Sequence, residues 1–131
     1  GAKCWGSGGS GQNGTGNTTT YATPQDVLGL TSGVTKVETN GATACALTSA
    51  GAVYCWGNNT FGNVGDGTTT NRLSPVAVTG LSSGVTDIAV SYTDHVCAAK
   101  DTKLHCWGKM DSGALASGTA DPTTPQNVLF P

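Results

Sequence analysis

Apolar and polar residues alternate along short stretches of this chain, and glycine, proline and asparagine separate the stretches. In one unit the alternation predicts a half-buried strand over 34–39, a hairpin with arms at 44–48 and 52–56, and a short strand at 75–78. No stretch has the sustained 3.6-residue period of an amphipathic helix. We therefore expect an all-β protein.

The same order of elements returns further along the chain at a fixed interval. The tripeptide Cys-Trp-Gly begins at positions 4, 55 and 106, so both intervals are 51 residues (55 − 4 and 106 − 55). A second unit has its first strand at 85–90, its hairpin arms at 96–100 and 103–107, and its last strand at 125–128. Three or four short antiparallel strands in every repeat are typical of β-propeller blades.

The 131 residues hold about two and a half such repeats. We divide the chain into a trailing half-repeat at 1–28 and full repeats at 29–79 and 80–131, which together form one continuous repeat domain. Repeats of this kind bury their apolar faces against neighbouring repeats. We therefore expect the blades to belong to a larger propeller or to an assembly.

Four of the five cysteines lie in pairs on the predicted hairpins. The turns set Cys45 opposite Cys55 and Cys97 opposite Cys106, at a separation that a disulfide accepts. Such bonds persist in oxidising compartments, so we expect an extracellular or cell-surface protein. Zinc is the alternative, although Cys-x9-Cys and Cys-x8-Cys are not the usual close ligand pairs. Cys4 is predicted to stay unpaired or to form an interchain bridge.

The three tryptophans occupy equivalent positions in the repeats. Trp5, Trp56 and Trp107 are expected to pack between blades, with their indole N–H groups bonded to the backbone. A sugar-stacking surface is the alternative, and it would need the three rings exposed side by side.

The motif around the second Cys-Trp-Gly carries a family resemblance. The pattern G-x-V-x-C-W-G-x-N-x-x-G-x-x-G-x-G-T resembles the regulator of chromosome condensation repeat, above all its cysteine-containing version in secreted bacterial proteins. The resemblance covers nearly all of the chain and implies blades of a seven-bladed propeller, a ring of ~350 residues. The third copy departs from the pattern at 109–110 and 116–117. The best matches are Gly51, Val53, Trp56, Gly57, Asn58, Gly62, Gly65 and Gly67.

Charge and composition exclude several classes of function. Charged residues form only 11% of the chain, the net charge is −2, and the six basic residues are scattered singly, so a nucleic-acid partner is not expected. No apolar run of 18 residues predicts a membrane span. Asp94 and His95 are adjacent and would point to opposite faces of a strand, which argues against a catalytic relay. We predict no enzyme activity, no metal site and no cofactor.

Two sets of loop residues are candidate sites. The first set comprises the sequon asparagines Asn13, Asn17 and Asn58, which are N-glycosylation acceptors if the source glycosylates. The second set comprises candidate protein contacts, because aromatic residues and arginine dominate binding hot spots. Its members are Tyr21, Phe61, Arg72 and Tyr92.

These features together predict a non-enzymatic extracellular structural or interaction module. It would assemble with copies of itself or with the rest of a longer chain, as in a cell-surface or fibrous protein. The alternative is a secreted protein-binding propeller of the inhibitor or adhesion type. A guanine-nucleotide exchange factor is less favoured, because disulfides do not suit an intracellular protein.

Overall fold

The computed structural model describes residues 1–109 and 121–128. In this part of the chain, ten strands form three antiparallel sheets, one of two strands and two of four. The departures from the repeat pattern at Met110 and at Ala116–Ser117 lie outside the described residues. The strands are β1 (Lys3–Gly6), β2 (Tyr21–Asp26), β3 (Val34–Thr39), β4 (Thr43–Thr48), β5 (Val53–Gly57), β6 (Arg72–Ala77), β7 (Val85–Val90), β8 (His95–Lys100), β9 (Lys103–Gly108) and β10 (Gln126–Asn127).

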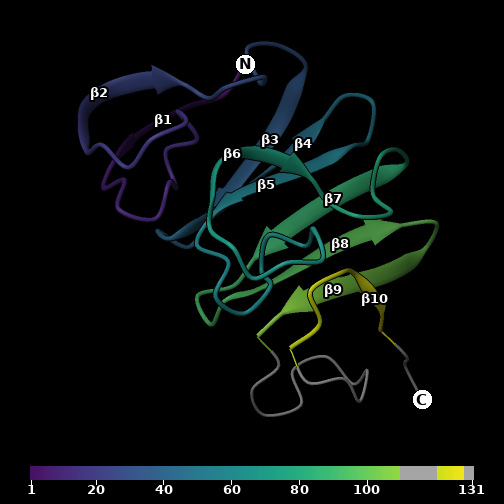
Figure 1. Ribbon diagram of the computed structural model, residues 1–131. Coiled ribbons are helices and arrows are strands. Elements are labelled where there is room, and N and C mark those ends of the chain that lie inside the picture. Colours follow the sequence, from purple (N-terminus) through teal and green to yellow (C-terminus); the bar gives the residue numbers. More distant parts are fainter. Residues whose placement is uncertain (110–120, 129–131) are drawn as a thin grey trace.

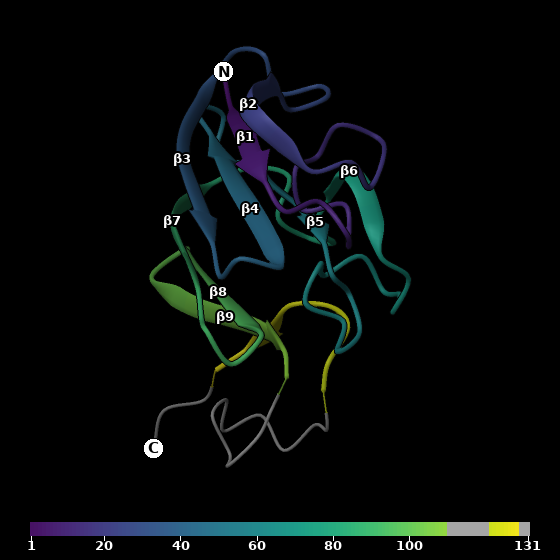
Figure 2. The ribbon, with the colours of Figure 1, turned by 90° about the vertical axis from the view of Figure 1, so that its left-hand side faces the viewer.

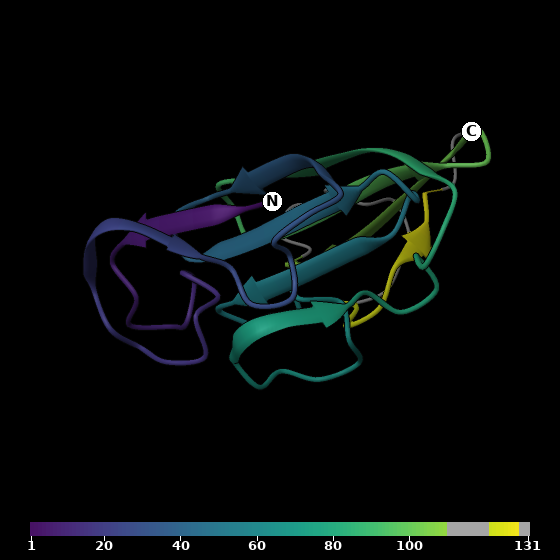
Figure 3. The same cartoon turned by 90° about the horizontal axis from the view of Figure 1, so that it is seen from above.

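Each sheet is built from strands that are consecutive in the sequence. β1 and β2 form an N-terminal half-blade, β3 to β6 form the first complete blade, and β7 to β10 form the second. The three sheets follow one another in chain order, and the half-blade and β10 lie at opposite ends of the molecule (Figures 1 and 3). The predicted all-β, propeller-type fold is confirmed, and the described strands do not close into a ring.

The strands have the register that the alternation predicts. Cys45 pairs with Cys55, and Cys97 pairs with Cys106, across the two hairpins. β3 and β7 have the predicted bounds, whereas β6 begins three residues before the predicted 75–78. Its Pro75 is tolerated because β6 is the outermost strand of its sheet, where a missing backbone N–H breaks no internal ladder.

The core lies between neighbouring sheets rather than within one sheet. A larger cluster joins the two complete blades and contains Leu47, Ile88 and Trp107. A smaller cluster joins the half-blade to the first complete blade and contains Val27 and Trp56. In Figure 2 the sheet of β3 to β5 lies between the half-blade and β7 to β9, and its strands β4 and β5 are largely buried. This is the arrangement expected of repeats that bury their faces against one another.

Candidate interaction surface at the N-terminal half-blade

Two of the three tryptophans occupy equivalent positions between neighbouring blades. The Trp56 Nε1 donates a hydrogen bond to the Gln12 carbonyl at 2.8 Å, and the Trp107 Nε1 donates to the Asn63 carbonyl at 2.9 Å. The two acceptors are one repeat apart (63 − 12 = 51). Both rings are fully buried. Each ring is therefore held by a loop of the preceding repeat.

The third tryptophan has different surroundings in the described residues, and its predicted packing between blades stays a prediction. Trp5 is 59% exposed, whereas Trp56 and Trp107 are 0% exposed. The loop carbonyl that would match Gln12 and Asn63 would lie upstream of residue 1. The described residues therefore include no loop of a preceding repeat against which the Trp5 ring could pack. The local sequence of the three sites is alike, so the difference comes from the neighbouring repeat.

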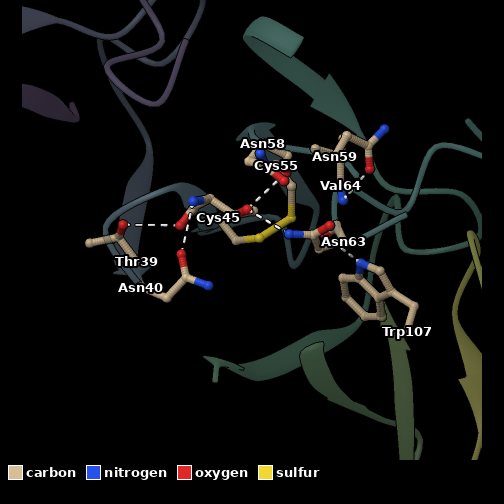
Figure 4. Close-up of a disulfide and its surroundings, with 10 residues drawn as sticks. Thr39, Asn40, Cys45, Cys55, Asn58, Asn59, Asn63, Val64 and Trp107 are labelled. Atoms are coloured by element: carbon tan, nitrogen blue, oxygen red, sulfur yellow. Dashed lines mark hydrogen bonds between the residues drawn. A yellow bond between two sulfur atoms is a disulfide. The ribbon is translucent and has the colours of Figure 1, made fainter. Parts of the chain in front are cut away.

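The two hairpin disulfides are present, and the first lies in a buried hydrogen-bond network (Figure 4). Cys45 and Cys55 are bonded, as are Cys97 and Cys106, with Cα atoms 4.1 Å apart in each pair. Beside the first bond, the Thr43 hydroxyl donates to the Asn58 carbonyl at 2.8 Å and accepts from the Asn63 amide at 2.7 Å. The same network reaches the second complete blade, because the Asn63 carbonyl accepts a hydrogen bond from the indole N–H of Trp107.

Cys4 is the free cysteine of the structure and lies half-buried on β1. Burial raises the pKa of its thiol above the ordinary value of 9.0, because the thiolate is poorly solvated there. β1 pairs with β2 on one side only. In contrast, β5 lies between β4 and β6, and β9 lies between β8 and β10. Among the described strands, none therefore lies against the edge of β1 that faces away from β2.

A slot of about 400 Å³ follows this open edge. Cys4 and Trp5 line it from β1, and Val37, Thr39 and Ala44 line it from β3 and β4. Figure 2 shows β1 beside β3 and β4 at the N-terminal end of the molecule. We call this cavity the β1 slot. Sequence reasoning did not select its residues on β3, although the repeat offered the signal: Val37 lies one repeat before Ile88 (88 − 37 = 51).

The β1 slot exposes side chains whose counterparts are covered. Val37 is 40% exposed, whereas Ile88 is 1% exposed under β4. At the end of β1, Gly6 has a φ of +100° and no atom within 4 Å of a Cβ built on it. A Cβ on Gly57 would meet the Ala42 carbonyl oxygen at 2.3 Å, and one on Gly108 would meet the Asp94 carbonyl oxygen at 2.5 Å. The turn that closes this site in both complete blades is thus absent beside β1.

The structure corrects the sequon at Asn13. Its side chain is 1% exposed, and its amide donates to the Gly6 carbonyl at 3.0 Å and the Thr19 carbonyl at 3.2 Å. A buried amide with two backbone partners cannot accept a glycan without losing the loop that it holds. Asn17 and Asn58 are partly exposed, so glycosylation there stays a prediction.

Two of the candidate contact residues are engaged within the protein. The Arg72 Nε donates to the Asp66 carboxylate at 2.7 Å. Burial acts to raise the pKa of Asp66, but hydrogen bonds from Thr68 and Arg72 outweigh it and hold this pKa below its ordinary value. Tyr21 exchanges hydrogen bonds with the Asn17 side chain. Both side chains brace loops and are only partly exposed.

The other two candidates lie on the surface at different places. Phe61 is partly exposed, and the Lys109 ammonium lies 4.7 Å from its ring centroid. Tyr92 is 91% exposed on the turn between β7 and β8. The structure does not bring the four predicted contacts together into one patch. The described residues include no cluster of three or more metal-ligating side chains and no helix long and apolar enough to cross a membrane.

Comparison with known proteins decides the family. Two models of the regulator of chromosome condensation (RCC1) repeat match residues 50–99 and 34–63. The human E3 ubiquitin-protein ligase HERC2 is 35% identical over 119 residues, which are 89% of this chain and 2% of that protein.

The chain belongs to the RCC1 repeat family.

Two other relatives extend the comparison. The Ras guanine nucleotide exchange factor C of Dictyostelium discoideum is 33% identical over 85 residues, or 64% of this chain and 6% of that protein. The crystal structure of Prp20p from Saccharomyces cerevisiae matches with a TM-score of 0.76 at 16% identity, covering 96% of this chain and 33% of that one. This structural match supports the fold alone. The chain spans at most a third of each of these proteins.

Proposed function

We propose that this RCC1-repeat chain is a non-enzymatic, extracellular interaction module that assembles through the open face of its half-blade. The assembly would join further repeats of the same kind, on copies of this chain or elsewhere in a longer one. The observation that carries the proposal is the exposure of Trp5 and Val37, whose counterparts in the complete blades are buried. Exposed apolar side chains gathered around an open strand edge are typical of an interaction surface.

The extracellular part of the proposal rests on the paired cysteines. Both complete blades carry a disulfide at the same place, fully buried in the first blade and partly exposed at Cys97 in the second. Such bonds persist where the redox environment is oxidising. The thiol count of the native protein, alkylated under denaturing conditions without reductant, tests this part. We expect one free thiol, or none where Cys4 is bridged. Four further free thiols would contradict an extracellular location.

Chemical cross-linking tests the contact surface in the native protein. Lys3 lines the β1 slot, and the exposed Lys103 lies on the second complete blade as a matched control. We expect cross-links from Lys3 to a second copy of the chain or to polypeptide outside residues 1–131, in excess of those from Lys103. Equal yields from the two lysines would contradict the proposed surface. Accelerated nucleotide release from a small GTPase would instead support the exchange role that one relative's name carries.

A second candidate function rests on the turn between β7 and β8. The turn is one residue longer than its counterpart between β3 and β4, and it presents Tyr92 with 91% of its surface exposed. An exposed tyrosine on a projecting turn is a suitable anchor for a protein ligand. In that case Tyr92→Ser would abolish capture of one secreted partner, whereas Trp5→Ser would leave capture intact. The reverse result would favour assembly through the half-blade.

A further inference from the structure

We propose that the β1 slot receives one antiparallel strand from a further repeat of this type, outside these 131 residues, and that a cysteine of this strand bonds to Cys4. This inference rests on the proposed function and names the partner of the same surface. It follows from the two complete blades, in which the strand beside each Cys-Trp-Gly segment is present and its chemistry is visible.

The first step is the position of the occupant. In the first complete blade β4 lies against β5, and in the second β8 lies against β9, each with its cysteine bonded to that of the Cys-Trp-Gly strand. β4 of the first complete blade packs on β7 of the second and covers Ile88 of β7. By the same repeat geometry, a strand in the β1 slot would pair with β1 and cover Val37 of β3.

The second step is the chemistry of the occupant. On the face that carries the cysteine, β4 has Thr43 before it and Leu47 after it, all buried. The Thr43 hydroxyl satisfies the carbonyl that follows the Cys-Trp-Gly segment, and Leu47 packs into the inter-blade core. Ala44 and Ala46 lie between them and are also buried. The expected strand is therefore a polar residue, a small residue, cysteine, a small residue and an apolar residue.

The third step excludes a symmetric pairing of two copies through β1. With Cys4 opposite Cys4 of a second copy, Gly6 of that copy would occupy the place that Leu47 fills in the complete blade. Ala2 would stand at the place of Thr43, where it has no hydroxyl to offer. The slot would remain unfilled and a carbonyl would remain unpaired. The other four cysteines of a copy are already bonded in its own blades.

The bond forms by ordinary thiol oxidation. The two thiols lose two protons and two electrons to a small-molecule disulfide, which is reduced to two thiols. An extracellular compartment supplies such an oxidant, so the reaction is consistent with the location proposed above. Strand pairing comes first and brings the two sulfur atoms together, because directly opposed residues of antiparallel strands lie within bonding reach.

A peptide with the sequence of residues 30–50 of this chain is the probe, since it contains β3, β4 and Cys45. It is incubated with the intact chain in a glutathione redox buffer, and the adducts are mapped by mass spectrometry. The control peptide carries Cys45→Ala and Ala46→Cys, which moves the thiol to the opposite face of the strand. We expect about tenfold more adduct at Cys4 with the native register, the ratio that ~1.4 kcal/mol of strand pairing produces.

A second readout does not depend on sulfur. With Cys4→Ser in the chain, the native peptide should still slow amide hydrogen exchange in β1, because a paired strand protects those N–H groups. Val37→Asp should remove this protection by placing a charge in the slot. Leu28→Asp is the matched control, since Leu28 is 51% exposed and lies outside the slot.

Each other result would overturn the inference. Equal amounts of adduct from the two peptides would show that Cys4 is only a reactive thiol. If neither adduct nor protection from exchange is found, no strand binds in the slot. Disulfide-linked dimers of the chain through Cys4, formed in preference to the peptide adduct, would assign the slot to a second copy. Cross-links from Lys3 in the native protein alongside a failed peptide test would keep the proposed function and overturn its strand partner.

Discussion

The half-blade and the first complete blade contain the same Cys-Trp-Gly segment in opposite surroundings. Trp56 is fully buried and Cys55 is bonded, whereas Trp5 is 59% exposed and Cys4 is free. The two strands have the same local conformation at the glycine, with φ of +100° at Gly6 and +99° at Gly57. The comparison shows that the local sequence determines the backbone conformation of the Cys-Trp-Gly segment, whereas contacts with the preceding repeat determine whether its side chains are buried.

The long loops of the two regions show how one backbone form is kept by different side chains. In the half-blade the Asn13 amide binds the Thr19 carbonyl, and in the complete blade the Asn59 amide binds the equivalent Thr70 carbonyl at 2.9 Å. The two asparagines are not at equivalent positions, since Asn13 corresponds to Val64 (64 − 13 = 51). The loop therefore needs a buried amide at one point in space, and more than one sequence position supplies it.

The largest predicted difference between the regions comes from the tryptophans. Trp56→Ala should lower the free energy of unfolding by about 3–5 kcal/mol, because it empties a packed space between blades. Trp5→Ala should lower it by less than about 1 kcal/mol in the isolated chain, since the ring is mostly in water. Denaturant unfolding measures both. Equal losses would mean that Trp5 is buried in solution and would break the comparison.

The next effect comes from the cysteines. Replacing Cys45 and Cys55 together by alanine removes a cross-link between residues 10 apart, which should cost about 2–3 kcal/mol by the loop-closure estimate. Thermal unfolding with and without reductant measures this loss. Cys4→Ala is the control and should shift neither the melting temperature nor its response to reductant. The double variant keeps the Cys97–Cys106 disulfide, so any remaining sensitivity of its melting temperature to reductant comes from that bond. A double variant as stable as the unmodified chain would contradict the prediction.

A smaller effect is expected at the glycine that faces each seated tryptophan. Gly65 has a φ of +79°, and a Cβ there would meet the Trp107 Nε1 at 2.6 Å. Gly65→Ala should therefore destabilise by about 1–2 kcal/mol from backbone strain, with the contact adding to it. Gly9→Ala is the control, because a Cβ at Gly9 meets nothing within 4 Å. Similar stabilities of the two variants would show that Gly65 is not tightly packed against Trp107.

The smallest effect concerns the ion pair that braces the complete blade's loop. The pKa of Asp66 lies below its ordinary value of 3.8, so the folded state binds its proton less readily than the unfolded state. Its contribution is present above pH 3.8 and is lost as the pH falls through the lowered pKa. Asp66→Asn should remove about 1 kcal/mol at neutral pH and nothing in strong acid. The exposed Asp101→Asn serves as the control in the same pH series.

Much of the fold was accessible from the sequence because strand alternation and turn residues act over short distances. The register of both hairpins follows from where the turns lie, and it brings Cys45 to Cys55 and Cys97 to Cys106. The exposure of Trp5 did not follow, because it depends on a neighbouring repeat rather than on the ring's own segment. The burial of Asn13 did not follow either, since a sequon motif does not show which carbonyls lie within reach of the side chain.

By itself the sequence determined the repeat, the strand order, the paired cysteines and the membership of a family. These depend on spacing and local preference, which persist in any context. Only the tertiary structure decided which faces are covered, because a side chain's burial depends on atoms far away in the chain. It showed that Val37 and Ile88, equivalent in sequence, differ in exposure by the presence of one packed strand. The β1 slot and its expected occupant follow from that difference.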